Sequence, residues 1–323
     1  MTALVWCAIG LVLLIVGAEL VVRGGTRVAA RLGVPPLVVG LTIVAIGTST
    51  PELAVGIDAA LRGESDLAVG NIAGTNIVNI LLILGMSALI RPLAIRMQTI
   101  RLDLPMMVIA SLMLMAMAWD GTLTRTEGII LTASGLAYTA TLLRVARREG
   151  HSVKAAFTDE FGVEPDPTPV PETLLSLGGL VAGIVVIVIG ADWLVDGAVA
   201  LARQWGVSDA FIGLTIVAIG TSAPELATTI VSTFRNARDI AIGNLLGSSV
   251  YNILFILGVT CIVPDSGIQV GRALILIDIP LMTAVALLCV PVFISGRRVT
   301  RLEGALFVSA YAAYLAYLIA ART

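Results

Sequence analysis

The sequence predicts an all-α membrane protein in which ten transmembrane helices form two inverted five-helix repeats. The first observation is composition. Of the 323 residues, 58% are hydrophobic and 13% are charged, which is more apolar surface than a soluble core of this size can hide. The second is a series of apolar segments long enough to cross about 30 Å of hydrocarbon. The third is a duplication of the first half of the chain in the second half.

The apolar segments define the predicted helices. The first lacks the basic start and the cleavage site of a signal peptide, so we interpret it as a transmembrane helix. A charged, proline-rich stretch after the fifth segment is typical of a solvated linker. We therefore divide the chain into a first repeat (1–145), a cytoplasmic linker (146–172) and a second repeat (173–323). The segments lie near residues 2–22, 36–62, 67–90, 103–119, 126–145, 174–195, 209–234, 240–263, 273–295 and 302–321.

Basic residues predict the orientation in the membrane. Of the 20 Lys and Arg residues, 15 fall in the linker or in the other loops after odd-numbered helices. Because basic loops stay in the cytoplasm, we expect the linker inside, both termini outside, and a location in the cytoplasmic (inner) membrane. The net charge of −2 provides no basic field for nucleic acid, and no obligate protein partner is evident. The remaining five basic residues are Arg62, Arg125, Arg203, Arg272 and Arg322.

The duplication has a shift of 173 residues. It aligns GLTIVAIGTSTPELA (40–54) with GLTIVAIGTSAPELA (213–227), and 27 of 46 positions are identical between 40–85 and 213–258. Each repeat holds five predicted helices, and an odd number makes the two copies enter the membrane from opposite sides. Inverted repeats of this kind are typical of secondary transporters and favour them over channels or membrane enzymes.

The repeated motifs GTSTPE (47–52) and GTSAPE (220–225) place a proline and a glutamate inside apolar segments. Pro51 has no N–H to donate to the Gly47 carbonyl, so we expect the helix to break there, and the same at Pro224. The break should expose the carbonyls around Ala45 and Ala218, whose polarity suits a cation.

Oxygen-bearing side chains accompany each break. Thr48 and Ser49 lie one turn before Glu52, and the third helix of each repeat adds a hydroxyl one turn before an amide. Carboxylates, hydroxyls, amides and carbonyls form an all-oxygen set, which suits Ca²⁺, Na⁺ or Mg²⁺ better than zinc or copper. We therefore predict a cation site and neither catalysis nor a cofactor. Its candidate residues are Glu52, Glu225, Thr48, Thr221, Ser49, Ser222, Thr75, Ser248, Asn79, Asn252, Ala45 and Ala218.

Other polar residues have structural explanations. Asp58 lies one turn from Arg62 and is expected to form a surface ion pair with it. Glu19 and Asp192 occupy equivalent positions in the two repeats and are expected to be solvated near helix ends. The lone histidine, His151, lies in the linker and is expected to be solvated as well.

The two GTSxPE motifs, each followed by a GNxxG[ST] segment (70–75 and 243–248), resemble the alpha repeats of the cation/calcium exchanger superfamily. The branch that the chain most resembles is that of the sodium/calcium exchangers, and the resemblance covers all ten predicted helices. It implies that Glu52, Glu225, Thr48 and Thr221 bind Ca²⁺ between the repeats. It also implies sodium sites at Ser49, Ser222, Thr75, Ser248, Ala45 and Ala218, with Asn79 and Asn252 closing the central position.

The chain departs from that branch at Asn252, where many sodium/calcium exchangers have aspartate. Two carboxylates instead of three suffice for Ca²⁺ but weaken the case for sodium coupling. The resemblance thus implies an antiporter that exchanges Ca²⁺ for Na⁺ by alternating access. The alternatives are the same fold coupled to H⁺ or carrying Mg²⁺ or Mn²⁺, and, as other classes, a cation channel or a membrane hydrolase.

Overall fold

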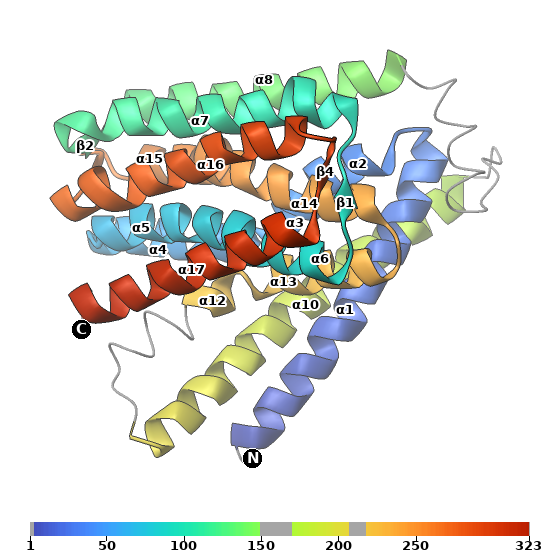
Figure 1. Ribbon diagram of the computed structural model, residues 1–323, viewed down its shortest axis with the longest axis horizontal. Helices are drawn as coiled ribbons and strands as arrows, with labels where there is room; N and C mark the ends of the chain where they lie inside the picture. The colour runs from blue at the N-terminus through green and yellow to red at the C-terminus, as the bar shows by residue number, and fades with distance from the viewer. Residues whose placement is uncertain (1–2, 149–169, 207–217, 323) are drawn as a thin grey trace.

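The computed structural model describes residues 3–148, 170–206 and 218–322, and these form a bundle of helices (Figure 1). In this part of the chain, eight helices are long and apolar enough to cross a membrane, and a ninth span is broken between Pro36–Thr48 and Thr50–Arg62 with a bend of 43°. The predicted all-helical membrane fold is therefore confirmed. The seventh predicted helix, 209–234, begins outside the described residues, and what is described of it is α12 (Ala218–Thr221) and α13 (Ala223–Phe234).

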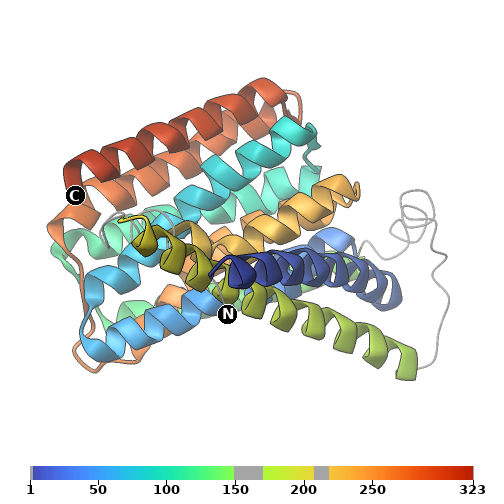
Figure 2. The same cartoon turned by 90° about the horizontal axis from the view of Figure 1, so that it is seen from below.

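Helices α1 (Ala3–Leu32) and α10 (Val170–Gln204) lie side by side and antiparallel at one edge of the bundle (Figures 1 and 2). Both are longer than the predicted 2–22 and 174–195, because the apolar run ends before the helix does. Past residue 22, α1 carries its charge on long arginine side chains, whose stems can lie along apolar surface while the charge reaches water. The two helices approach closely through glycine: a Cβ at Gly17 would lie 2.7 Å from the backbone nitrogen of Ile187.

The other elements of the first half are the broken span, which runs from α2 through α4, and the elements that follow it. Their bounds are α2 Pro36–Val39, η1 Gly40–Val44, α3 Ala45–Thr48, α4 Thr50–Arg62, α5 Ser65–Ile77, η2 Val78–Leu84, α6 Gly85–Ile90, η3 Thr99–Asp103, α7 Leu104–Met117, η4 Ala118–Asp120 and α8 Arg125–Arg148. Here η4 is a short 3₁₀ turn, whereas η1, η2 and η3 are π-helical.

The second half carries similar elements at equivalent positions. They are α14 Arg238–Tyr251, η6 Asn252–Leu257, α15 Gly258–Ile262, η7 Leu274–Asp278, α16 Ile279–Ile294 and α17 Arg301–Arg322. The π-helices η6 and η7 recur where the first half has η2 and η3. Single π-turns often mark functional positions in helices.

Two short antiparallel strand pairs join the two halves of the chain. Apolar periodicity in the sequence does not reveal these strands. Strand β1 (Leu93–Ala94) pairs with β4 (Arg298–Val299), and β2 (Thr122–Leu123) pairs with β3 (Ile268–Gln269). Each pair joins a loop of the first half to a loop of the second.

The centre of the bundle is formed by the spans Ser65–Ile90 and Arg238–Ile262. Their most apolar windows are 78% and 83% buried, whereas those of the other six unbroken spans are 22–39% buried. The outer helices instead expose large apolar side chains such as Leu112, Leu136 and Leu306, as lipid-facing surfaces do. The two segments that carry the GN motifs are therefore the ones most shielded from lipid.

Candidate cation site

Both GTSxPE motifs interrupt a helix at the same point. Helix α3 ends at Thr48 and α4 begins at Thr50, with Ser49 at φ −85° and ψ 13° between them. Ser222 separates α12 from α13 with nearly the same angles, φ −87° and ψ 8°. Each proline occupies the first turn of the following helix, where its missing N–H is tolerated. The break therefore falls at the serine, two residues later than the expected Gly47.

The carbonyl of Ala45 is not left open by this break, contrary to expectation. It accepts a hydrogen bond from the backbone N–H of Ser49 at 3.0 Å, and the hydroxyl oxygens of Thr48 and Ser248 lie 3.3 and 3.5 Å from it. The break at Ser49 keeps the preceding turn intact, so this carbonyl retains a helical partner. Of Ala218, the counterpart, only the backbone is described.

The two motif glutamates are fully buried and converge. Oγ of Ser49, in the first half, donates a hydrogen bond of 2.9 Å to Oε1 of Glu225, in the second half. Ser248 donates to the same oxygen at 3.4 Å. The carboxyl groups of Glu52 and Glu225 lie close enough to interact electrostatically.

Several oxygens around these acids have no hydrogen-bond partner among the described residues. They include both carboxylate oxygens of Glu52, Oε2 of Glu225, Oγ of Ser222 and Oδ1 of Asn252. Neither amide atom of Asn79 has a partner there either. Buried polar atoms are almost always paired in folded proteins, so a group of unpaired acceptors indicates a place where an ion or water binds.

The two amides begin the π-helices, Asn252 as the first residue of η6 and Asn79 as the second of η2. Asn252 donates through Nδ2 to Oδ1 of Asn76 at 3.1 Å, and Asn76 donates to the carbonyl of Ser249 at 3.1 Å. Sequence reasoning missed Asn76, since its counterpart is Ser249 and the repeat offers no matching amide.

A second amide that was not singled out lies inside the GN motif. Oγ1 of Thr48 donates to Oδ1 of Asn244 at 3.1 Å, and Nδ2 of Asn244 donates to Oγ1 of Thr229 at 3.2 Å. Asn244 and its counterpart Asn71 are identical in the two repeats, and this identity was the available signal. Of the other candidate hydroxyls, Thr75 is buried and Thr221 is half-buried.

This arrangement favours hard cations. Within the described residues, no group of three or more His, Cys, Asp or Glu side chains could hold a metal, and no ion pair involves Glu52 or Glu225. The unpaired atoms are mainly oxygens from two carboxylates, amides and hydroxyls. Such donors suit Ca²⁺, Na⁺ or Mg²⁺.

The predicted surface pair of Asp58 and Arg62 is confirmed, with Nε of Arg62 3.0 Å from Asp58. The prediction for Glu19 is wrong, because its carboxylate lies away from the helix end and pairs with two arginines. His151 lies outside the described residues.

Two buried aspartates were missed by the sequence reasoning. Oδ1 of Asp103 accepts a hydrogen bond of 3.0 Å from the hydroxyl of Tyr138, and Oδ1 of Asp278 accepts one of 3.0 Å from Tyr314. Each aspartate is the last residue of a π-helix, η3 or η7. The shared Asp-aliphatic-Pro pattern at 103–105 and 278–280 was the available signal.

Together, these observations define a multi-pass membrane protein with a buried, oxygen-rich candidate cation site. A family model described as sodium/calcium exchanger protein matches residues 2–144 and 175–320. The chain is 35% identical over 315 residues to the putative antiporter CaxA of Alkalimonas amylolytica, covering 97% of this chain and 98% of that protein. It is 29% identical to the sodium/calcium exchanger MaX1 of Methanosarcina acetivorans, covering 96% of each.

Among solved structures, that of the sodium/calcium exchanger from Methanococcus jannaschii matches with a TM-score of 0.81, 27% identity and 97% coverage of each chain. The chain belongs to the sodium/calcium exchanger protein family.

Proposed function

We propose that this protein is a secondary antiporter that exchanges Ca²⁺ for Na⁺ by alternating access across the cytoplasmic membrane. The observation that carries the proposal is the convergence of Glu52 and Glu225, which leave three buried carboxylate oxygens without hydrogen-bond partners among the described residues. The names of relatives as sodium/calcium exchangers support calcium and sodium as the cargo.

The architecture we propose is ten transmembrane helices in two inverted repeats, with the linker in the cytoplasm and both termini outside. The recurrence of helix breaks at Ser49 and Ser222, and of π-helices at η2 and η6, supports the repeat. The excess of basic residues in the loops after odd-numbered helices supports the orientation.

Charge explains why the site should exchange ions without leaking them. With both glutamates ionised, the empty site carries a charge of −2, and moving it through the bilayer is unfavourable. One Ca²⁺ neutralises this charge, and Na⁺ ions bound to the same oxygens neutralise it as well. Only the loaded protein then changes its conformation readily, which couples the two ions.

The second candidate is coupling to H⁺, and Asn252 is the observation that favours it. An aspartate there would supply a third carboxylate, whereas the amide leaves two acids, each of which can be neutralised by a proton. Transport of Mg²⁺ or Mn²⁺ is compatible with the same oxygens.

The test is radioactive calcium uptake into proteoliposomes loaded with sodium, with protons or with neither. We expect uptake only into sodium-loaded vesicles, inhibited by excess unlabelled Ca²⁺ more than by Mg²⁺ or Mn²⁺. Uptake driven by a proton gradient alone would replace Na⁺ by H⁺ in the proposal. Flux without any counter-ion would contradict antiport and indicate a channel.

A further inference from the structure

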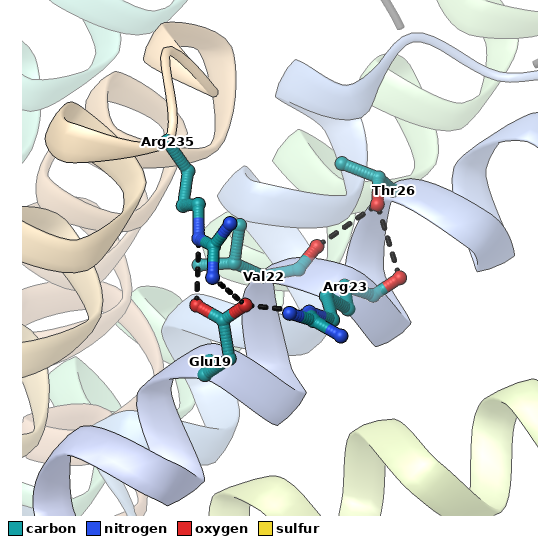
Figure 3. A network of polar contacts seen from close by, with 5 residues as sticks. All are labelled: Glu19, Val22, Arg23, Thr26 and Arg235. Carbon is teal, nitrogen blue, oxygen red and sulfur yellow. Dashed lines mark hydrogen bonds and ion pairs between the residues drawn. The ribbon is translucent and has the colours of Figure 1, made fainter. Parts of the chain in front are cut away.

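The carboxylate of Glu19 joins two helices that are far apart in the sequence (Figure 3). Nη2 of Arg235 lies 2.5 Å from Oε1 of Glu19, and Nε of Arg235 donates to Oε2 at 2.9 Å. Arg23, one turn further along α1, lies 2.5 Å from the same carboxylate. Arg235 is the residue that follows α13, so this bidentate pair joins α1 to the end of the helix that carries Glu225.

The ion pair is part of a more extensive contact between helices α1 and α13. A cavity of about 330 Å³ is lined by the second half of α10 and by α12 and α13, and it borders Gly220, two residues before the break at Ser222. The broken segment that carries Glu225 therefore packs against α1 near the Glu19 pair and borders a cavity beside α10.

The repeat assigns counterparts to both members of the pair. A shift of 173 residues maps Glu19 onto Asp192 in α10 and Arg235 onto Arg62 at the end of α4, so both charges are kept. In the described conformation this second pair is not formed, since Arg62 binds Asp58 on its own helix and Asp192 is exposed. Among the described residues, α10 makes no contact with α4 comparable to that of α1 with α13.

Helices α1 and α10 pack closely against each other along their length. Glycines recur every seventh residue along both, at 10, 17 and 24 and at 183, 190 and 197. A Cβ at Gly10 would lie 2.5 Å from the backbone nitrogen of Leu194, and a Cβ at Gly190 would lie 2.7 Å from that of Leu14. Contacts between backbones this close resist sliding of one helix past the other.

We propose that Glu19–Arg235 and Asp192–Arg62 are alternating gates of the exchanger, each closing one side of the cation site while the other is open. A movement of the α1–α10 pair that brings Asp192 to Arg62 withdraws Glu19 from Arg235, so the two pairs exclude each other. Asp58 binds Arg62 while the Asp192–Arg62 gate is open. In the second repeat, the position equivalent to Asp58 is Val231, which cannot bind Arg235 in this way. This inference rests on the alternating access proposed above.

The experiment is cross-linking with a short bis-methanethiosulfonate reagent in a variant whose native cysteines, Cys7, Cys261 and Cys289, are replaced by alanine. A spacer is needed because an Arg–Glu pair can hold its Cα atoms farther apart than the roughly 7 Å that a direct disulfide tolerates. One pair of substitutions is Glu19→Cys with Arg235→Cys, and the other is Arg62→Cys with Asp192→Cys. Both pairs connect the two halves of the chain, so a protease site inserted between residues 149 and 169 reports each cross-link on a gel. The control pair is Thr122→Cys with Gln269→Cys, whose Cα atoms face each other in β2 and β3.

We expect the first pair and the second pair each to cross-link, and each cross-link to lower calcium exchange at least tenfold until reductant is added. The control pair should cross-link without slowing exchange. When all four gate cysteines are combined, one molecule should form only one of the two gate cross-links. Failure of the Arg62→Cys and Asp192→Cys pair to cross-link in a protein that exchanges calcium would overturn the gates. So would unchanged exchange in either cross-linked gate.

A charge swap tests the same gate without cysteines. Arg235→Glu should slow exchange at least tenfold, and combining it with Glu19→Arg should restore most of the rate. A double variant as slow as the single one would contradict a role for the ion pair. If the cysteine-free protein moved no calcium against any counter-ion, the proposed function would fail, and the two cross-links would still report whether the gates alternate.

Discussion

Ser49 and Glu225 lie 176 residues apart in the sequence and share a buried hydrogen bond of 2.9 Å. The serine belongs to the first motif and the glutamate to the second, so this bond shows directly that the two motifs meet. It also leaves the carboxylates unequal, since Glu225 has two hydroxyl donors and Glu52 has none among the described residues.

The Ser49 bond predicts a graded loss of affinity. A hydrogen bond to a charged group contributes about 1.5–3 kcal/mol, which corresponds to roughly a ten- to hundredfold change in affinity. We expect Ser49→Ala to raise the cation concentration for half-maximal exchange by about that factor, and Ser49→Thr to keep most of the affinity. Exchange titrations in proteoliposomes measure both, and equal effects of the two substitutions would argue against the bond.

Neutralising either motif glutamate is predicted to abolish calcium exchange. Glu52→Gln and Glu225→Gln each keep the size of the side chain but halve the charge of the site, so we expect calcium exchange to fall to the background of empty liposomes. Asp265→Asn is the matched control, because its side chain is 96% exposed and lies outside the spans. Exchange at the wild-type rate in either glutamate variant would show that the acids do not share the ion.

Asn252→Asp is expected to increase the sodium dependence of exchange by adding a third carboxylate. The structure adds a second consequence, since aspartate cannot donate to Oδ1 of Asn76. The cation-free variant should therefore melt at a lower temperature, and added Na⁺ should raise its melting temperature more than that of the wild type. Asn79→Asp is the comparison, because it adds the same charge where no hydrogen bond is present among the described residues. An unchanged sodium response in both variants would contradict this account.

The α1–α10 contact predicts a different effect for two glycine substitutions. A Cβ at Gly17 would meet backbone atoms of α10, whereas one at Gly178 would have no atom within 4 Å. We expect Gly17→Ala to destabilise the helix pair by about 1–3 kcal/mol and to slow exchange, and Gly178→Ala to have no effect. Thermal melting in detergent, measured beside exchange, distinguishes a loose pair from an unfolded protein, and equal melting temperatures would refute the prediction.

The buried Asp–Tyr pairs predict that removing either tyrosine hydroxyl lowers the stability of the protein by the same amount. Tyr138→Phe and Tyr314→Phe each remove the donor to a buried aspartate, which should lower stability by about 1–3 kcal/mol. Melting temperatures measured side by side check this, with exposed Tyr317→Phe as the control. A loss in one half only would show that the equivalent bonds are not equivalent in energy.

Much of the fold could be predicted from the sequence because it depends on local chemistry. The length of the apolar segments predicted the nine described spans. Proline predicted the breaks near Ser49 and Ser222, and the repeat placed Glu52 and Glu225 at equivalent depth. The end of α1 could not be predicted, because arginine ends an apolar run without ending a helix. Asn76 could not be found either, since nothing in its local sequence indicates that it faces Asn252.

The sequence by itself determined which segments enter the membrane, where they break and which acidic residues occupy equivalent positions in the two repeats. It could do so because transfer free energy and backbone sterics act over a few residues. Only the tertiary structure decided which oxygens remain unpaired and that Glu19 binds Arg235 while Asp192 and Arg62 stay apart. Those partners are up to 216 residues distant along the chain, and their contact depends on how whole helices pack.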